Sequence, residues 1–274
     1  MRFIYFTLLF LLAASCGKSK QEPEKPTDPV KGGPVIKVMT YNIHIGNPPS
    51  EAATSRNLQA IANVINLQKP DLVALQEVDV NTTRSGKDVD QAKELARLTG
   101  MSYFYTKAID YQGGQFGDAV LSRLPIIESK RYELSVTSEL GGELRSVAMI
   151  VVEKDGIRFN FASTHLDHLS ADTNRDHQAR ELVNHIKVLD KPLIIAGDLN
   201  AQPTHNAIKI LQEQLTYACS SNCPFTFPSV NANRTIDYIM LNKPEKFIVK
   251  DYRIINETYA SDHLPVMATI ELKK

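Results

Sequence analysis

The sequence has no excess of charge of either sign, with 31 basic and 31 acidic residues in 274. After position 34 the acids slightly outnumber the bases. Proteins dedicated to nucleic-acid binding usually carry a basic excess, because they neutralise phosphates along the backbone. The balance therefore argues against long polyanions as the main partners of this chain.

Cysteine is also scarce, and the three present are Cys16, Cys219 and Cys223. A structural zinc site needs four nitrogen or sulfur ligands, and two neighbouring cysteines are too few to build one. An oxidising compartment would allow Cys219 and Cys223, in "CSSNC", to form a disulfide bond. Two free thiols are the alternative.

Long apolar runs are absent except at the start, where residues 1–16 read "MRFIYFTLLFLLAASC". This run is too short to span a membrane and is typical of a secretory signal. Small residues directly before Cys16 resemble a bacterial lipoprotein signal, which is cleaved before a lipidated cysteine; plain secretion is the alternative. We expect a lipid-anchored protein of the cell envelope, periplasmic or on the cell surface, that meets the membrane only through this anchor.

Residues 17–34 are rich in proline and charge and cannot build a core, so they are expected to form a flexible linker. The remaining segment, 35–274, has the length of one large domain. Its apolar periodicity predicts three helices, at 55–68, 90–100 and 175–189. It also predicts strands at 35–43, 71–78, 117–122, 126–134, 145–152, 157–164, 192–197, 235–241, 247–255 and 265–271.

Strand pairs joined by turns imply antiparallel pairing, and strand–helix–strand units imply some parallel pairing. About ten strands rarely lie in one open sheet. We therefore expect an α/β fold with two mixed β-sheets packed face to face and helices outside them.

Polar residues stand at the ends of six of these apolar strands. A carboxylate or amide at the end of a buried strand is costly unless something satisfies it. One such group could be structural, but the repetition indicates a shared pocket. Its members are Asn42, Glu77, His165, Asp198, Asn200, Asp237, Asp262 and His263.

The oxygen-bearing members of this set suit a hard cation such as Mg²⁺ or Mn²⁺, which binds carboxylates and keeps waters for a phosphate. They are Asn42, Glu77, Asp198, Asn200 and Asp262. The histidines then remain for proton transfer or for holding phosphate. The set indicates metal-assisted attack of water on a phosphoester.

The order of short motifs resembles the endonuclease/exonuclease/phosphatase superfamily, the deoxyribonuclease-I-like metal-dependent phosphoesterases. The motifs are "YNI", "LQEV", "GDAVLSRLPI", "STHLDH", "GDLNAQP", "TFPS…RTIDYIM" and "SDHLPV". Each is weak alone, but the seven occur in the family's order from about 36 to 271. The resemblance implies a four-layer α/β sandwich and hydrolysis of phosphoesters, most often phosphodiesters.

The resemblance also implies roles for single residues. Asn42, Glu77 and Asp262 match the metal-binding positions. His165 matches the histidine that contacts phosphate, and Asp198 and Asn200 match the pair beside the attacking water. Asp237 matches the acid that orients the last histidine, and His263 matches the general base.

Four further residues are candidate substrate contacts: Asp118, Arg145, Asp167 and His168. Relatives often have Asn at the position of Asp118. Arg145 could equally form a structural ion pair, because a guanidinium suits carboxylate and phosphate alike. Arg175 and Gln178 are expected to brace the loop that carries His165.

Two other functions remain open. "THLDH" faintly resembles the zinc cluster of metallo-β-lactamase-like hydrolases, but Ser163 stands where a further histidine would be needed. The chain could also be a catalytically inactive, lipid-anchored binding protein of the same fold. For the hydrolase, the substrate could be a nucleic acid, a phospholipid or a small phosphodiester, and we expect a monomer.

The lipoprotein interpretation is tested by fractionation of cells. Cys16→Ser should move the protein from the membrane fraction to the soluble fraction, because a single residue carries the lipid. Cys219→Ser is the matched control and should leave the protein with the membrane. A wild-type protein that is wholly soluble and cleaved at another position would refute the anchor.

Overall fold

The structure is a computed structural model that describes residues 1, 3, 4, 32–139, 141–220 and 222–274. Gly33–Lys274 form one compact unit. Cys16 and most of the expected signal and linker lie outside the described residues. Among the described residues, no helix combines the length and the apolar character needed to cross a membrane.

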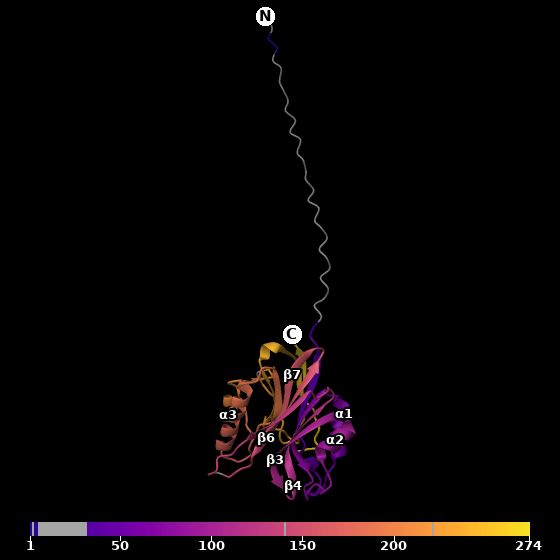
Figure 1. Cartoon of the computed structure of the whole chain (residues 1–274). Coiled ribbons are helices and arrows are strands. Elements are labelled where there is room, and N and C mark those ends of the chain that lie inside the picture. Colours follow the sequence, from indigo (N-terminus) through magenta and orange to yellow (C-terminus); the bar gives the residue numbers. More distant parts are fainter. Residues whose placement is uncertain (2, 5–31, 140, 221) are drawn as a thin grey trace. The chain divides into compact units, whose positions relative to one another are not determined.

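Twelve strands of the described part form two six-stranded sheets (Figure 1). The first sheet has the order β11-β12-β1-β2-β4-β3, and only β1 and β2 pair in parallel. Its strands are β1 (Val35–Asn42), β2 (Leu72–Val80), β3 (Ser102–Tyr111), β4 (Gly114–Ser122), β11 (Phe247–Ile254) and β12 (Val266–Leu272).

The second sheet has the order β5-β6-β7-β8-β10-β9, and only β7 and β8 pair in parallel. Its strands are β5 (Glu128–Leu134), β6 (Arg145–Lys154), β7 (Ile157–His165), β8 (Leu193–Asp198), β9 (Thr216–Tyr217) and β10 (Asp237–Asn242). Both sheets are therefore mixed, as the sequence predicts.

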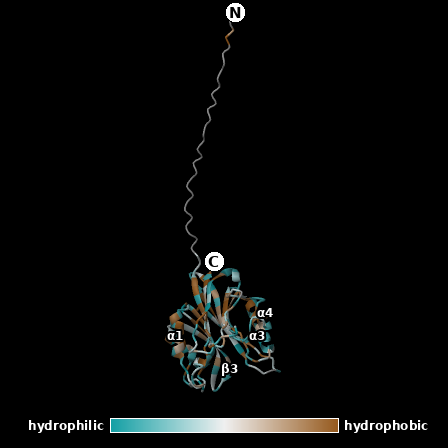
Figure 2. Ribbon diagram, turned by 180° about the vertical axis from the view of Figure 1, so that it is seen from behind, coloured by the Kyte–Doolittle hydropathy of each residue, from teal (hydrophilic) through white to brown (hydrophobic). Residues whose placement is uncertain are grey.

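Helices cover the outer face of each sheet. Figure 2 shows α1 (Leu58–Gln68) on one side of the strands, and α3 (Thr173–Lys187) and α4 (Asn206–Leu211) on the other. The helix α2 (Gln91–Thr99) lies beside α1 (Figure 1). It ends at Gly100, which has a φ of +65° that glycine adopts without strain. The predicted four-layer sandwich is confirmed.

Three apolar layers separate these four structural layers. One lies between the first sheet and α1 and α2, and another lies between the second sheet and α3 and α4. The central layer lies between the sheets and contains Phe159 and Phe161 of β7 and Ile194 of β8, all fully buried. Because side chains alternate along a strand, Leu193 and Ile195 face the helices instead.

The structure also contains elements that the sequence analysis missed. The strand β3 is half-exposed and lies at a sheet edge, so its apolar periodicity is weak. The strand β9 and the helix α4 are too short for a periodic pattern. Cys219 and Cys223 are joined by a disulfide bond, with their Cα atoms 5.4 Å apart.

Candidate active site

The site is the polar end of the layer between the two sheets. Along β8 the inward positions run Ile194, Ala196 and then Asp198. The same alternation carries other strands from apolar residues to polar ones at this end. The polar members are Asn42 of β1, Gln76 of β2, Asp118 of β4, Ser146 of β6, Ser163 and His165 of β7, and Asp237 of β10.

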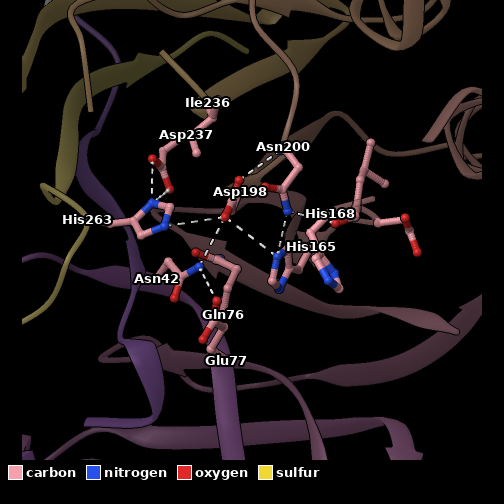
Figure 3. A network of polar contacts seen from close by, with 12 residues as sticks. Asn42, Gln76, Glu77, His165, His168, Asp198, Asn200, Ile236, Asp237 and His263 are labelled. Atoms are coloured by element: carbon pink, nitrogen blue, oxygen red, sulfur yellow. Dashed lines mark hydrogen bonds and ion pairs between the residues drawn. The ribbon is translucent and has the colours of Figure 1, made fainter. Parts of the chain in front are cut away.

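Asp198 lies at the centre of the resulting network (Figure 3). Its Oδ1 accepts the backbone N–H of Asn200 at 2.8 Å, and its Oδ2 accepts Nδ2–H of Asn42 at 3.1 Å. The Nε2 atoms of His165 and His263 lie 3.6 and 3.7 Å from the same Oδ2. Burial and the nearby charge of Asp237 raise the pKa of Asp198 to about 7.

Glu77 reaches this network through a break in the strand pattern. The pairing of β2 with β4 shifts between Leu75 and Val78, which marks a β-bulge, and Glu77 has a φ of +57°. A left-handed conformation is strained for a non-glycine residue and is often found at functional sites. The bulge turns the carboxylate toward Asn42, whose Nδ2 donates to Glu77 Oε1 at 3.0 Å.

Asp237 and His263 form a buried pair. Nδ1 of His263 lies 3.1 and 3.0 Å from the two carboxylate oxygens of Asp237. The ring of Phe227 packs against the His263 ring, with the two ring centres 4.7 Å apart. Burial lowers the pKa of His263, but the charges of Asp237 and Asp198 outweigh it and raise that pKa to about 10. The pair fixes which ring nitrogen points at Asp198.

His165 has hydrogen-bond donors at both ring nitrogens. Arg145 Nη1 donates to Nδ1 at 3.3 Å, and Asn200 Nδ2 lies 3.0 Å from Nε2. Burial and the charge of Arg145 hold the pKa of His165 well below its usual value. A neutral imidazole accepts at one nitrogen only, so this corner has more donors than acceptors.

These groups surround a cavity of about 470 Å³. Eight of the predicted site residues line it: Glu77, Arg145, His165, His168, Asp198, Asn200, Asp262 and His263. Asn42 and Asp237 stand behind this surface and contact it through Glu77, Asp198 and His263.

The model of the Endonuclease/Exonuclease/phosphatase family matches residues 39–263, which include the whole second sheet, most of the first and every residue that lines the cavity. The chain belongs to this family. Its fold is that of the family's phosphoesterases, and the network around Asp198 occupies one end of that fold.

Three relatives show how far the likeness extends. The uncharacterized protein YbhP of Escherichia coli K12 is 28% identical over 258 residues, covering 86% of this chain and 96% of YbhP. A family structure from Beutenbergia cavernae has a TM-score of 0.71 at 23% identity and covers 87% of this chain and 72% of its own. The structure of a mannosyl-6-phosphatase of Bacteroides thetaiotaomicron has a TM-score of 0.70 at 20% identity. The match covers 86% of this chain and 99% of the phosphatase.

Two sets of side chains in this site could hold a divalent cation. Asp198, Asp237 and His263 offer ligand atoms within 4.8 Å of one another. Glu77 and Asp262 offer hard oxygen ligands on the cavity wall. Asn42, as oriented, is a weaker candidate, because its Oδ1 accepts the backbone N–H of His44 at 3.0 Å and its N–H groups face the acids.

Two candidate substrate contacts lie away from the cavity. Asp167 is fully buried, and its oxygens accept the backbone N–H groups of Glu143 and Leu169. Arg175 Nη1 donates to the backbone carbonyl of Asp167, and the side-chain oxygen of Gln178 accepts the backbone N–H of Asp167. Arg175 and Gln178 therefore brace this loop, as the sequence analysis expects. The zinc alternative weighed for "THLDH" has Asp167 in its motif, and both carboxylate oxygens of Asp167 already accept backbone N–H groups.

Asp118 is the other residue away from the cavity. It is buried between the sheets, where Oδ2 accepts a hydrogen bond from Ser146 Oγ at 2.8 Å. Oδ1 has no hydrogen-bond partner in the described part of the chain. Burial raises the pKa of Asp118 from its ordinary 3.8 to about 7.

Other residues of the site escaped the sequence analysis. Gln76 is fully buried and links the sheets, since it accepts from Thr40 Oγ1 and donates to Ser163 Oγ at 2.9 Å. It precedes Glu77 and so fixes one side of the bulge. The cavity-lining residues Arg84 and Arg234 were also missed. The available signal for Arg234 was that it opens the quoted motif "RTIDYIM".

Asp118→Asn should weaken the dependence of stability on pH. The raised pKa means that the folded state binds a proton more tightly than the unfolded state, so this group's stabilisation is present below about pH 4 and is lost as the pH rises through 7. The variant should therefore be about 1–3 kcal/mol more stable than wild type at pH 8, with a smaller difference at pH 4.

Urea unfolding at several pH values measures this difference. Asp88→Asn, at an exposed position, is the control and should not change the profile. A variant that is less stable than wild type at pH 8 would show that the carboxylate form is preferred in the folded state.

Proposed function

We propose that this chain is a divalent-metal-dependent hydrolase of phosphoesters, with phosphodiesters as the expected substrates. The observation that carries the proposal is the position of Asp198 on the cavity wall, between two histidines and in contact with Asn42, which also holds Glu77. Such a group can orient a water molecule while neighbouring residues hold a phosphate and move protons.

The donor-rich corner supports phosphate binding. Arg145 is 2% exposed and lines the cavity, and its Nη2 lies 3.2 Å from Nδ1 of His168. His165 and Asn200 add further donors to the same corner. Arg145 also pairs with Glu143 at 3.1 Å, but its buried Nε has no hydrogen-bond partner in the described part of the chain. Phosphate oxygens would supply further acceptors, and charge-assisted hydrogen bonds of this kind are strong.

The acids fit a divalent cation by their chemistry. Glu77 and Asp262 are carboxylates that line the cavity, and Mg²⁺ or Mn²⁺ is commonly bound by one or two carboxylates together with substrate oxygens. When bound, such a cation would polarise a phosphate oxygen and offset the carboxylate charges that raise the pKa of His263.

The proton path uses His263 as a base and Asp237 as the residue that orients it. Nδ1 faces Asp237, so Nε2 is the nitrogen directed toward Asp198 and the cavity. An acid at Nδ1 stabilises the imidazolium that forms when Nε2 takes a proton from water. His165, held neutral, would remain a hydrogen-bonding partner of the phosphate.

The biological setting belongs to the same proposal. The lipid anchor at Cys16 would hold the enzyme at the cell envelope, and the flexible linker would let the domain reach substrates there. The Bacteroides mannosyl-6-phosphatase acts on a phosphomonoester by its name. Phosphomonoesters therefore belong in the substrate screen beside phosphodiesters.

Glu77→Gln should lower hydrolysis of bis(p-nitrophenyl) phosphate strongly and raise the Mg²⁺ or Mn²⁺ concentration needed for half of the maximal rate. The amide keeps the shape of the side chain but loses the charge that attracts the cation. Release of p-nitrophenol across a metal titration measures both effects, and circular dichroism checks the fold.

Two other variants sharpen this test. Glu133→Gln, on the exposed surface of β5, is the matched control and should behave as wild type. Asp237→Asn separates the two candidate metal sites, since it should change the metal requirement only if Asp198, Asp237 and His263 are the ligands. A folded wild-type protein without metal-stimulated hydrolysis of any phosphoester would favour the inactive binding protein.

A double-mutant cycle tests the proton path. His263→Ala and Asp237→Asn should each lower kcat by a factor on the order of 10² or more, which is typical of lost general-base catalysis. The double variant should be little worse than the worse single variant, because residues that act as a unit are non-additive. Multiplicative losses, in variants with cooperative thermal melts, would show that Asp237 only supports the strand.

A further inference from the structure

Three arginines line the cavity, and they differ in their partners. Arg84 forms two hydrogen bonds with the buried carboxylate of Asp79, at 2.8 and 2.9 Å. Arg145 forms an ion pair with Glu143 at 3.1 Å. Among the described residues, no acid lies within ion-pair distance of Arg234.

The position of Arg234 is fixed by its backbone. Phe227 and Arg234 exchange two backbone hydrogen bonds of 3.0 Å and so stand opposite each other in a short antiparallel bridge. Above this bridge the Arg234 guanidinium lies 4.7 Å from the centre of the Phe227 ring. Stacking of this kind holds a guanidinium in place while leaving its N–H donors open.

The Phe227 ring connects this cation to the reacting centre. Its other neighbour is the ring of His263, with the two centres 4.7 Å apart. Arg234 therefore belongs to the wall of the cavity beside His263. The corner that would hold the scissile phosphate is built from Arg145, His165 and Asn200, so Arg234 is available for a different group.

We propose that Arg234 binds a second anionic group of the substrate, outside the bond that is cleaved, and that the substrate is a small phosphoester carrying a further phosphate. This inference rests on the proposed function for the assignment of the scissile phosphate. A cavity of about 470 Å³ fits a small molecule, and the balanced net charge of the chain does not favour a long polyanion.

Isothermal titration calorimetry with two pairs of probes tests the inference. The pairs are thymidine 3′,5′-bisphosphate with thymidine 5′-phosphate, and fructose 1,6-bisphosphate with fructose 6-phosphate. EDTA in the buffer keeps hydrolysis out of the measurement. In at least one pair, the bisphosphate should bind roughly tenfold tighter than its monophosphate at low salt. This is the gain expected for one added hydrogen bond to a charged group.

Arg234→Met should abolish this preference and leave affinity for the monophosphate nearly unchanged, because methionine can still pack on Phe227. Arg180→Met is the matched control, since Arg180 is an exposed arginine of α3 that does not line the cavity, and it should keep the preference. Thermal melts of both variants check that the fold is intact.

Three results would overturn the inference: no preference for either bisphosphate, a preference that persists in Arg234→Met, or tighter binding of a single-stranded oligonucleotide than of both bisphosphates. The proposed function fails separately. If the protein prefers bisphosphates but hydrolyses no phosphoester, the inference about Arg234 stands and the proposed function is wrong. If it hydrolyses phosphoesters without this preference, the proposed function stands and the inference about Arg234 is wrong.

Discussion

The buried carboxylate of Asp198 imposes the constraint around which this end of the protein is built. A carboxylate between two sheets is costly unless hydrogen bonds or opposite charges satisfy it. The backbone of Asn200, the amide of Asn42 and the positive charge of His263 meet that need from three different segments, and His165 packs beside them. Satisfying one buried acid therefore brings together most of the groups that a phosphoesterase requires.

The hydrophobic core and the site are two ends of the same layer. The strands that contribute Phe161 and Ile194 to the central core contribute His165 and Asp198 to the cavity a few residues later. The core fixes the separation of the sheets, and the sheets fix the distances among the polar groups. Packed strands hold Glu77, His165 and Asp198 in place, which pre-organises this part of the site, while Asn200, Asp262 and His263 lie in loops next to strands.

Backbone strain and charge are concentrated where the strands end. Glu77 and Asn200 both have a positive φ, of 57° and 47°, and both face the cavity. Asp118 and Asp198 are buried acids whose pKa values are raised to about 7. Such features lower stability and persist when the surrounding packing enforces them. The four-layer core supplies that packing.

The sequence by itself determined the alternation of apolar residues, and with it the two mixed sheets and the strands that end in Asn42, His165 and Asp198. It also determined the family, through short motifs in a fixed order. The strands can be predicted from the sequence because side chains alternate between the two faces every two residues, a pattern that involves only near neighbours in the chain. The half-exposed edge strand β3 has little such periodicity and was missed.

Only the tertiary structure decided which polar residues meet. The bulge that turns Glu77 toward the site depends on the pairing of β2 with β4, far along the chain. Asp118 and Asp167 resemble site residues in sequence, yet the packing places one between the sheets and the other in a loop brace. Arg234 reaches the cavity because Phe227, its partner in a local bridge, packs against His263 of a later segment. Contacts between distant segments decide these positions, and a local pattern carries no record of them.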